Sequence, residues 1–164
     1  MTNNPRMAVL LIAPFLVLSL LLTLPVYADQ TFHTARLSLV LTSAGSAAGH
    51  PNLRSGHVVD IHTNGPIIYA LERYIVSGAK PHTDYQVELS VSLTGCANPQ
   101  NVLVPTALLV TNAQGNAHGN WTFTPANVAA AGLHAGMTLG ITWTLVSGGV
   151  TAYQTPSCIN VPLD

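Results

Sequence analysis

Alternating apolar and polar residues predict a series of short β-strands along the chain. The clearest alternation begins at Tyr85, where every second residue is apolar as far as Leu93 and the residues between them are polar. A turn containing Pro81 precedes this stretch, and the cysteine Cys96 follows it. Period-two alternation is typical of a half-buried antiparallel strand. We therefore expect this strand to lie centrally in the fold.

Further segments of this kind are separated by turn residues. The predicted strands are residues 31–41, 57–62, 67–76, 85–93, 102–111, 117–124, 138–146 and 150–161. Residues 67–76 also fit a helical pattern, but their β-branched and aromatic content and the preceding Asn64-Gly65-Pro66 turn favour a strand. About eight short strands at this spacing predict an all-β, antiparallel two-sheet sandwich.

Proline and glycine refine this prediction. Pro105 removes a ladder donor, so we expect its strand at a sheet edge or at a bulge. Residues 42–55 form a predicted loop that is long enough to carry a ligand. A short helix is predicted in Pro125–Ala135, because this segment is rich in alanine and Gly132 is placed to end it.

The first 28 residues predict export. Arg6 precedes the almost wholly apolar segment 8–24, and Val26 and Ala28 occupy the two small-residue positions that signal peptidase reads. We expect cleavage after Ala28, which leaves residues 29–164 as a single β-sandwich domain. An uncleaved anchor helix is the alternative.

The low charge of residues 29–164 limits the classes of partner. They contain four basic and six acidic residues, so their formal net charge is −2 with neutral histidines. The four cations are scattered, which excludes the basic footprint of a nucleic-acid-binding or anionic-membrane-binding protein. We expect no membrane contact after cleavage, a secreted or cell-surface location, and an extracellular protein or glycan as partner.

Cys96 and Cys158 predict one disulfide, because both lie in the exported segment. The bond would join the end of the central strand to the last strand. A metal site is the weaker interpretation, since paired C-x-x-C spacing is absent.

Two local motifs resemble known modules. Ala79–Leu89, with the sequence AKPHTDYQVEL, resembles the stretch of fibronectin type III and related immunoglobulin-like domains that contains a tyrosine corner. Residues 108–123 are similar to a hairpin of bacterial exported immunoglobulin-like modules. The resemblance implies an immunoglobulin-like sandwich and a role in adhesion, scaffolding or ligand display. It also implies a hydrogen bond from the Tyr85 hydroxyl back to the preceding turn.

His57, Asp60 and His62 are the candidate metal ligands. Asp60 and His62 share one face of a predicted strand, and a copper or zinc site would need a third imidazole. The available histidines are His33, His50 and His118. Because no pattern supplies a full ligand set, we expect neither a metal nor another cofactor. If the face that carries Asp60 is buried, its carboxylate needs a partner, for which the candidates are Arg36, Arg54 and Arg73.

Catalytic motifs are absent from the sequence. It contains no nucleophile elbow, P-loop or dinucleotide fingerprint. Glu72, Asp84 and Glu88 are the candidates for a glycosidase pair, but Asp84 is expected in a turn and Glu88 on a solvent face. We therefore expect no catalytic residues and no enzyme.

Trp121 is the candidate ligand platform, because an exposed aromatic face can stack on a sugar ring. Trp143, which lies between Ile141 and Leu145 on an apolar face, is expected in the core. The sequence thus predicts an exported, non-enzymatic immunoglobulin-like interaction module with an unknown partner. The alternatives are a small carbohydrate-binding module and a copper- or zinc-binding redox protein.

Overall fold

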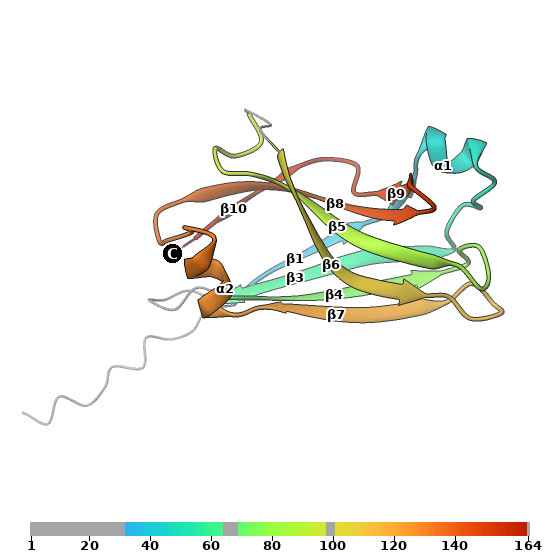
Figure 1. The fold of residues 1–164 in the computed structure, drawn as a ribbon, viewed down its shortest axis with the longest axis horizontal. Helices are drawn as coiled ribbons and strands as arrows, with labels where there is room; N and C mark the ends of the chain where they lie inside the picture. The colour runs from blue at the N-terminus through green and yellow to red at the C-terminus, as the bar shows by residue number, and fades with distance from the viewer. Residues whose placement is uncertain (1–31, 64–68, 98–100, 164) are drawn as a thin grey trace, which may run out of the picture.

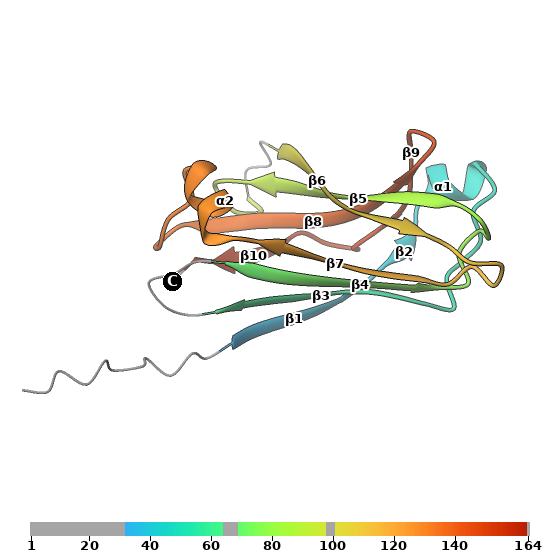
Figure 2. The ribbon, with the colours of Figure 1, turned by 60° about the horizontal axis from the view of Figure 1, so that its bottom comes forward.

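Within residues 32–63, 69–97 and 101–163, which the computed structural model describes, ten strands form two antiparallel sheets that pack face to face (Figure 1 and Figure 2). The first sheet has the order β1-β3-β4-β7, with strands β1 (Phe32–Ser38), β3 (Ser55–Thr63), β4 (Ala70–Ser77) and β7 (Ala117–Phe123). The second has the order β2-β9-β8-β5-β6, and β10 also pairs with β8. Its strands are β2 (Val40–Leu41), β5 (Asp84–Ser92), β6 (Asn101–Val110), β8 (Thr138–Ser147), β9 (Val150–Gln154) and β10 (Ile159–Pro162). The predicted all-β, two-sheet antiparallel sandwich is confirmed.

Some of the sequence predictions fall outside the described residues. The signal segment 1–28 with its cleavage site lies there, and so does the Asn64-Gly65-Pro66 turn. Over the part of the chain that the structure describes, no helix is long and apolar enough to cross a membrane.

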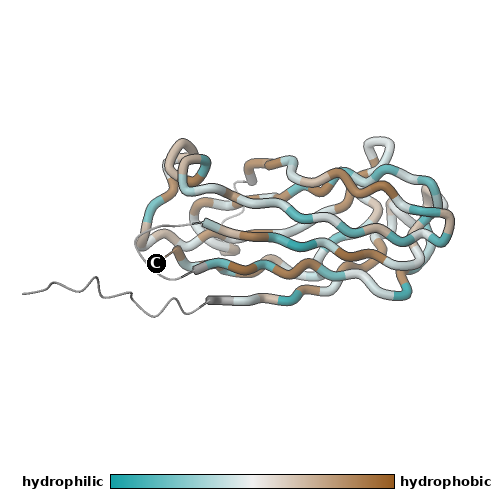
Figure 3. The backbone as a smooth tube through the Cα atoms, turned by 90° about the horizontal axis from the view of Figure 1, so that it is seen from below, coloured by the Kyte–Doolittle hydropathy of each residue, from teal (hydrophilic) through white to brown (hydrophobic). Residues whose placement is uncertain are grey.

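β5 occupies the interior position that its alternation predicted. It pairs with β6 on one side and with β8 on the other. Tyr85, Val87 and Leu89 are buried in the core between the sheets, whereas Leu93 follows the end of the strand and is exposed. Figure 3 shows apolar and polar positions alternating along the strands in the same way.

β4 confirms the strand interpretation of its segment. It pairs with β3 and with β7, so it lies inside the first sheet. Glu72, Tyr74 and Val76 are buried on one face, and Arg73 and Ile75 are exposed on the other. This period of two excludes the helical alternative.

β6 is an edge strand, as Pro105 predicted. Its pairing with β5 shifts in register between Gln86 and Glu88, and Pro105 lies opposite Glu88. A turn in which Gly115 has a φ of 73° connects β6 to β7, an edge strand of the first sheet. Because the two strands belong to different sheets, they do not form the hairpin that the resemblance implied for residues 108–123. The turn instead joins one edge strand of each sheet.

The first and last predicted strands are each divided in two, which raises the count above eight. β1 belongs to the first sheet and β2 to the second, so the chain crosses between the sheets at Leu39. The side chain of Leu39 is buried and its N–H donates to the carbonyl of Gly56 at 2.9 Å. β9 and β10 both pair with β8, and the segment between them contains Cys158.

Two short helices lie at opposite ends of the sandwich (Figure 1). The predicted helix is α2 (Pro125–Ala130); Thr124 caps its N-terminus and Gly132 follows it with a φ of 72°. The other helix, α1 (Ser43–Ala47), lies in the segment that we predicted to be a loop. Its five small residues carry little helix propensity, and its stability comes from the Thr42 cap and packing against β9.

The predicted disulfide between Cys96 and Cys158 is present, with a Cα–Cα distance of 5.8 Å. It ties the end of β5 to the segment that precedes β10. The Tyr85 hydroxyl interacts with the backbone of Lys80, which opposes the rise that burial causes in the pKa of Tyr85. The same oxygen lies 2.8 Å from Nδ1 of His50.

Candidate functional site

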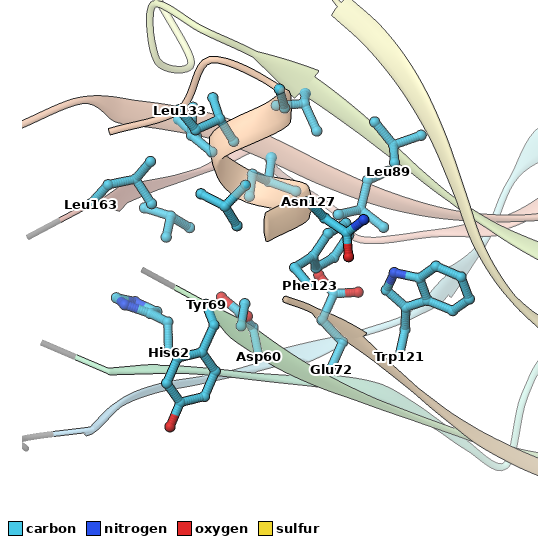
Figure 4. Close-up of a pocket in the computed structure, with 18 of the residues that line it drawn as sticks. Asp60, His62, Tyr69, Glu72, Leu89, Trp121, Phe123, Asn127, Leu133 and Leu163 are labelled. Atoms are coloured by element: carbon cyan, nitrogen blue, oxygen red, sulfur yellow. The ribbon is translucent and has the colours of Figure 1, made fainter. Parts of the chain in front are cut away.

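A cavity of about 380 Å³ lies between the two sheets at the end that carries α2 (Figure 4). Aliphatic side chains of the second sheet form one wall, among them Leu89, Ile141 and Val161. Val128 of α2 and Leu163, after the last strand, close the end. The lining is therefore mainly apolar.

The cavity forms because the sheets approach closely at only one end of the β6–β7 edge. Near the turn between β6 and β7, a side-chain carbon on Gly119 of β7 would lie 2.6 Å from the Leu109 side chain of β6, so glycine allows close packing there. At the other end β6 rises away from β7 (Figure 1). There Val102 and Val104 of β6 and Trp121 of β7 line the cavity. Val102 and Trp121 are also exposed, so the cavity opens to solvent beside these two side chains.

Two carboxyls lie on the opposite wall, which the first sheet provides. Asp60 of β3 and Glu72 of β4 are directly opposite each other in the antiparallel register. Their side chains are 3% and 1% exposed and both line the cavity. Figure 4 shows both carboxyl groups pointing from the sheet towards α2. Acidic residues are rarely buried this deeply without a partner.

The carboxyl of Glu72 is held by hydrogen bonds. Nε1 of Trp143 donates to Oε1 at 2.9 Å, and the hydroxyl of Tyr74 donates to Oε2. The Tyr74 hydroxyl also lies 3.0 Å from Oγ1 of Thr106. Burial raises the pKa of Glu72 to about 7; the two hydrogen bonds oppose the rise, and the nearby charge of Asp60 adds to it. Glu72 therefore connects the two sheets directly through Trp143 of β8, and indirectly through Tyr74, whose hydroxyl contacts Thr106 of β6.

Asp60 differs from Glu72 because, among the described residues, its carboxyl has no hydrogen-bond or ion-pair partner. Burial alone raises the pKa of Asp60 to about 6. Residues that lie directly opposite each other on adjacent strands point to the same face of a sheet. Asp60 lies opposite Ala35 of β1 and Glu72 of β4. Arg36 and Arg73, next in sequence to those two residues, are therefore on the outer face.

The predicted arginine partner of Asp60 is accordingly wrong. Arg36 lies 3.4 Å from His57 on the outer face, Arg54 donates to Asn116, and the side chain of Arg73 is exposed. The strand register places Arg36 and Arg73 away from the cavity, and Arg54 is engaged by Asn116 outside the strands.

The candidate metal ligands are divided between two faces of β3. Asp60 and His62 line the cavity, whereas His57 lies on the outer face beside Arg36. His50 contacts Tyr85, and the side chain of His118 is exposed. Within the described ranges, no group of three or more histidine, cysteine or acidic side chains is placed to hold a metal ion.

Trp121 lies at the opening of the cavity and is 40% exposed. Its ring centroid is 6.4 Å from that of Phe123, and the two ring planes are tilted by 70°. A pair tilted in this way does not form the coplanar platform on which pyranose rings stack. The exposed face of Trp121 borders an apolar cavity instead, opposite Asn127 of α2 (Figure 4). Trp143 is fully buried, as predicted.

The proposed glycosidase carboxylates are far apart in the topology. Glu72 faces the interior from the first sheet, whereas Asp84 is exposed and Glu88 is on the outer face of the second sheet. The facing pair of Asp60 and Glu72 was not predicted. The two residues are equidistant in sequence from residue 66, and this symmetry could have indicated that they lie opposite each other.

The arrangement provides an apolar space with one unpaired acidic group. Its chemistry is suited to holding an organic molecule by contact with aliphatic side chains and by one polar interaction. Comparison with protein-family models, with curated proteins and with solved structures finds no match for this chain.

Proposed function

We propose that this protein is an exported, non-enzymatic binding module that holds a small, largely apolar molecule between its two sheets. The observation that carries the proposal is the Asp60 carboxyl, which is buried and directed into an apolar cavity. The volume of about 380 Å³ is within the range of small-molecule sites, roughly 300 to 1,000 Å³. A mainly apolar wall with a small number of polar groups is typical of small-molecule binding sites.

The disulfide and the N-terminal segment support export. A disulfide between Cys96 and Cys158 is stable in an oxidising compartment, and the apolar segment 8–24 has the pattern of a signal peptide. The contact between Lys80 and Tyr85 supports a relationship to immunoglobulin-like modules. In this proposal the module acts outside the cell or on its surface.

The residues around the cavity favour binding over catalysis. Among the described residues that line it, there is no serine, cysteine, threonine or lysine to serve as a nucleophile. Glu72 is engaged by Trp143 and Tyr74, so its carboxyl oxygens already have donors. A ligand that enters the cavity would therefore meet mainly aliphatic and aromatic side chains, and Asp60 would be the available carboxyl.

Obstruction of the cavity tests the proposal. Ala131 lines the cavity next to α2 and is exposed, so Ala131→Trp places a large side chain at the rim without changing the core. Ala130→Trp is the matched control, because Ala130 is exposed on the same helix but does not line the cavity. We expect the neutral dye Nile red to bind the wild type and the control saturably, and to bind the Ala131→Trp variant at least about tenfold more weakly. Equal binding by all three proteins would contradict the proposal.

A further inference from the structure

We propose that the molecule held in the cavity is a hydrophobic amine, whose ammonium group pairs with the carboxylate of Asp60. This inference rests on the proposed binding function and adds the chemical class of the ligand. It follows from the buried carboxyl of Asp60, which has no partner among the described residues, and from the chemistry of the surrounding walls.

The two buried carboxyls differ in their hydrogen-bond partners. Glu72 accepts hydrogen bonds from Tyr74 and Trp143, whereas Asp60 has no such donor in the described ranges. A buried carboxylate without a donor or a cation is strongly unfavourable, and the structure nevertheless directs this one into a space large enough for a ligand. A cation in that space would remove the penalty.

The described part of the protein does not supply the cation for Asp60, because no lysine or arginine is among the described residues that line the cavity. His62 lines the same cavity two residues further along β3, and its ring lies on the Leu163 side (Figure 4). The positive charge next to Asp60 therefore has to come from the ligand.

Other classes of ligand fit less well. An anion would lie against two carboxyls, and a neutral molecule would leave the Asp60 charge uncompensated. Among the described residues, no group of three or more acidic, histidine or cysteine side chains is placed to hold a metal ion, and most of the remaining wall is aliphatic or aromatic. An ammonium group on an apolar body satisfies both the carboxylate and the wall.

The affinity should depend on pH. Burial raises the pKa of Asp60 to about 6, and the titratable groups around it are Glu72, His62 and the phenols of Tyr69 and Tyr74. The second sheet and α2 contribute no ionisable side chain to the cavity wall within the described residues. An alkylammonium stays charged over this range, so binding should be tight above pH 6 and weaken as Asp60 takes up a proton below it.

The test uses octylamine, octanol and octanoate, which share one chain and differ in the head group. In calorimetric titrations of the whole protein at pH 7.5, we expect octylamine to bind about tenfold or more tightly than octanol, and octanoate to bind most weakly. The preference for the amine should disappear at pH 5 and in the Asp60→Asn variant. Asp84→Asn, which changes an exposed carboxyl on β5, should keep it.

The outcomes separate the two proposals. Equal binding of octylamine and octanol to the wild type would overturn the amine assignment and leave the binding function in place. The assignment is also overturned if Asp60→Asn and Asp84→Asn retain the same preference. Failure of all three compounds to bind, together with failure of Nile red, would overturn the binding function itself. The pH series on the wild type gives an answer even if Asp60→Asn does not fold.

Discussion

Asp60 and Glu72 are directly opposite each other across the β3–β4 ladder, with both carboxyls in the space between the sheets. Two acidic groups this close and this buried cannot both ionise at the pH at which free carboxyls do. The interior of the sandwich therefore contains a site whose charge changes near neutral pH. Several measurable properties depend on this pair.

The stability of the protein should fall as the pH rises from about 4 to about 7. The folded-state pKa values of Asp60 and Glu72, about 6 and about 7, lie above their ordinary values of 3.8 and 4.5, so the folded state binds protons more tightly than the unfolded state. For Asp60 this shift contributes about 3 kcal/mol to the free energy of unfolding. The contribution is fully present below pH 4 and lost above pH 6. Urea unfolding at pH 4 and pH 8 measures this loss.

Asp60→Asn should remove the Asp60 part of that pH dependence, and Asp84→Asn should leave it unchanged, because Asp84 is exposed. The burial of an unpaired carboxyl would be contradicted if the wild type became more stable between pH 4 and pH 7 and Asp60→Asn showed the same increase.

Glu72→Ala should destabilise the fold by about 2 to 4 kcal/mol. The substitution leaves the Trp143 N–H, which is fully buried, without its acceptor, and it takes one acceptor from the Tyr74 hydroxyl. Glu88→Ala is the comparison, since Glu88 is on the outer face of β5 and should cost about 0.5 kcal/mol or less. Denaturant titrations that give equal losses for the two variants would show that the Glu72 contacts contribute nothing to stability.

Loss of the disulfide should lower the free energy of unfolding by about 4 kcal/mol, because the bond joins residues 62 positions apart. The double variant Cys96→Ala/Cys158→Ala and the wild type in dithiothreitol should melt at similar, lower temperatures. The melting temperature of the double variant should not respond to dithiothreitol. An unchanged wild-type transition under reducing conditions would mean that the bond does not stabilise the fold.

Ligand binding should change the fluorescence of Trp121. This side chain lies at the opening of the cavity and is partly exposed, so an octyl chain beside it should exclude water and shift its emission to shorter wavelength. Trp143 is already buried, so its emission should change little on binding. Trp121→Phe should therefore bind octylamine in calorimetry but lose the shift. A shift that persists in Trp121→Phe would place the ligand elsewhere.

Local patterns predicted the elements of the fold well. The alternation from Tyr85 onwards reflects burial of one strand face, and the position of Pro105 reflects a missing donor, so both were readable from neighbouring residues. α1 was missed because its five residues depend on a single capping side chain, Thr42, rather than on a periodic apolar face. The division at Leu39 depends on which sheet each half of the segment joins, and this is a property of the tertiary structure.

The candidate site was less accessible to sequence analysis. The burial of Asp60 was foreseen as a possibility, but its assigned arginine partner was wrong because the strand register puts Arg36 and Arg73 on the outer face. The cavity depends on how far β6 separates from β7, which no local pattern encodes. Its lining comes from segments as distant in sequence as Asp60 and Leu163.

The most direct measurement of the central claim is the detection of nuclear Overhauser effects between octylamine and the methyl groups of the protein. The account predicts contacts from the octyl chain to Leu89, Ile141 and Leu163, which line the cavity on three segments. Contacts confined to Leu103 and Leu108, which are exposed on the outer face of β6, would contradict it.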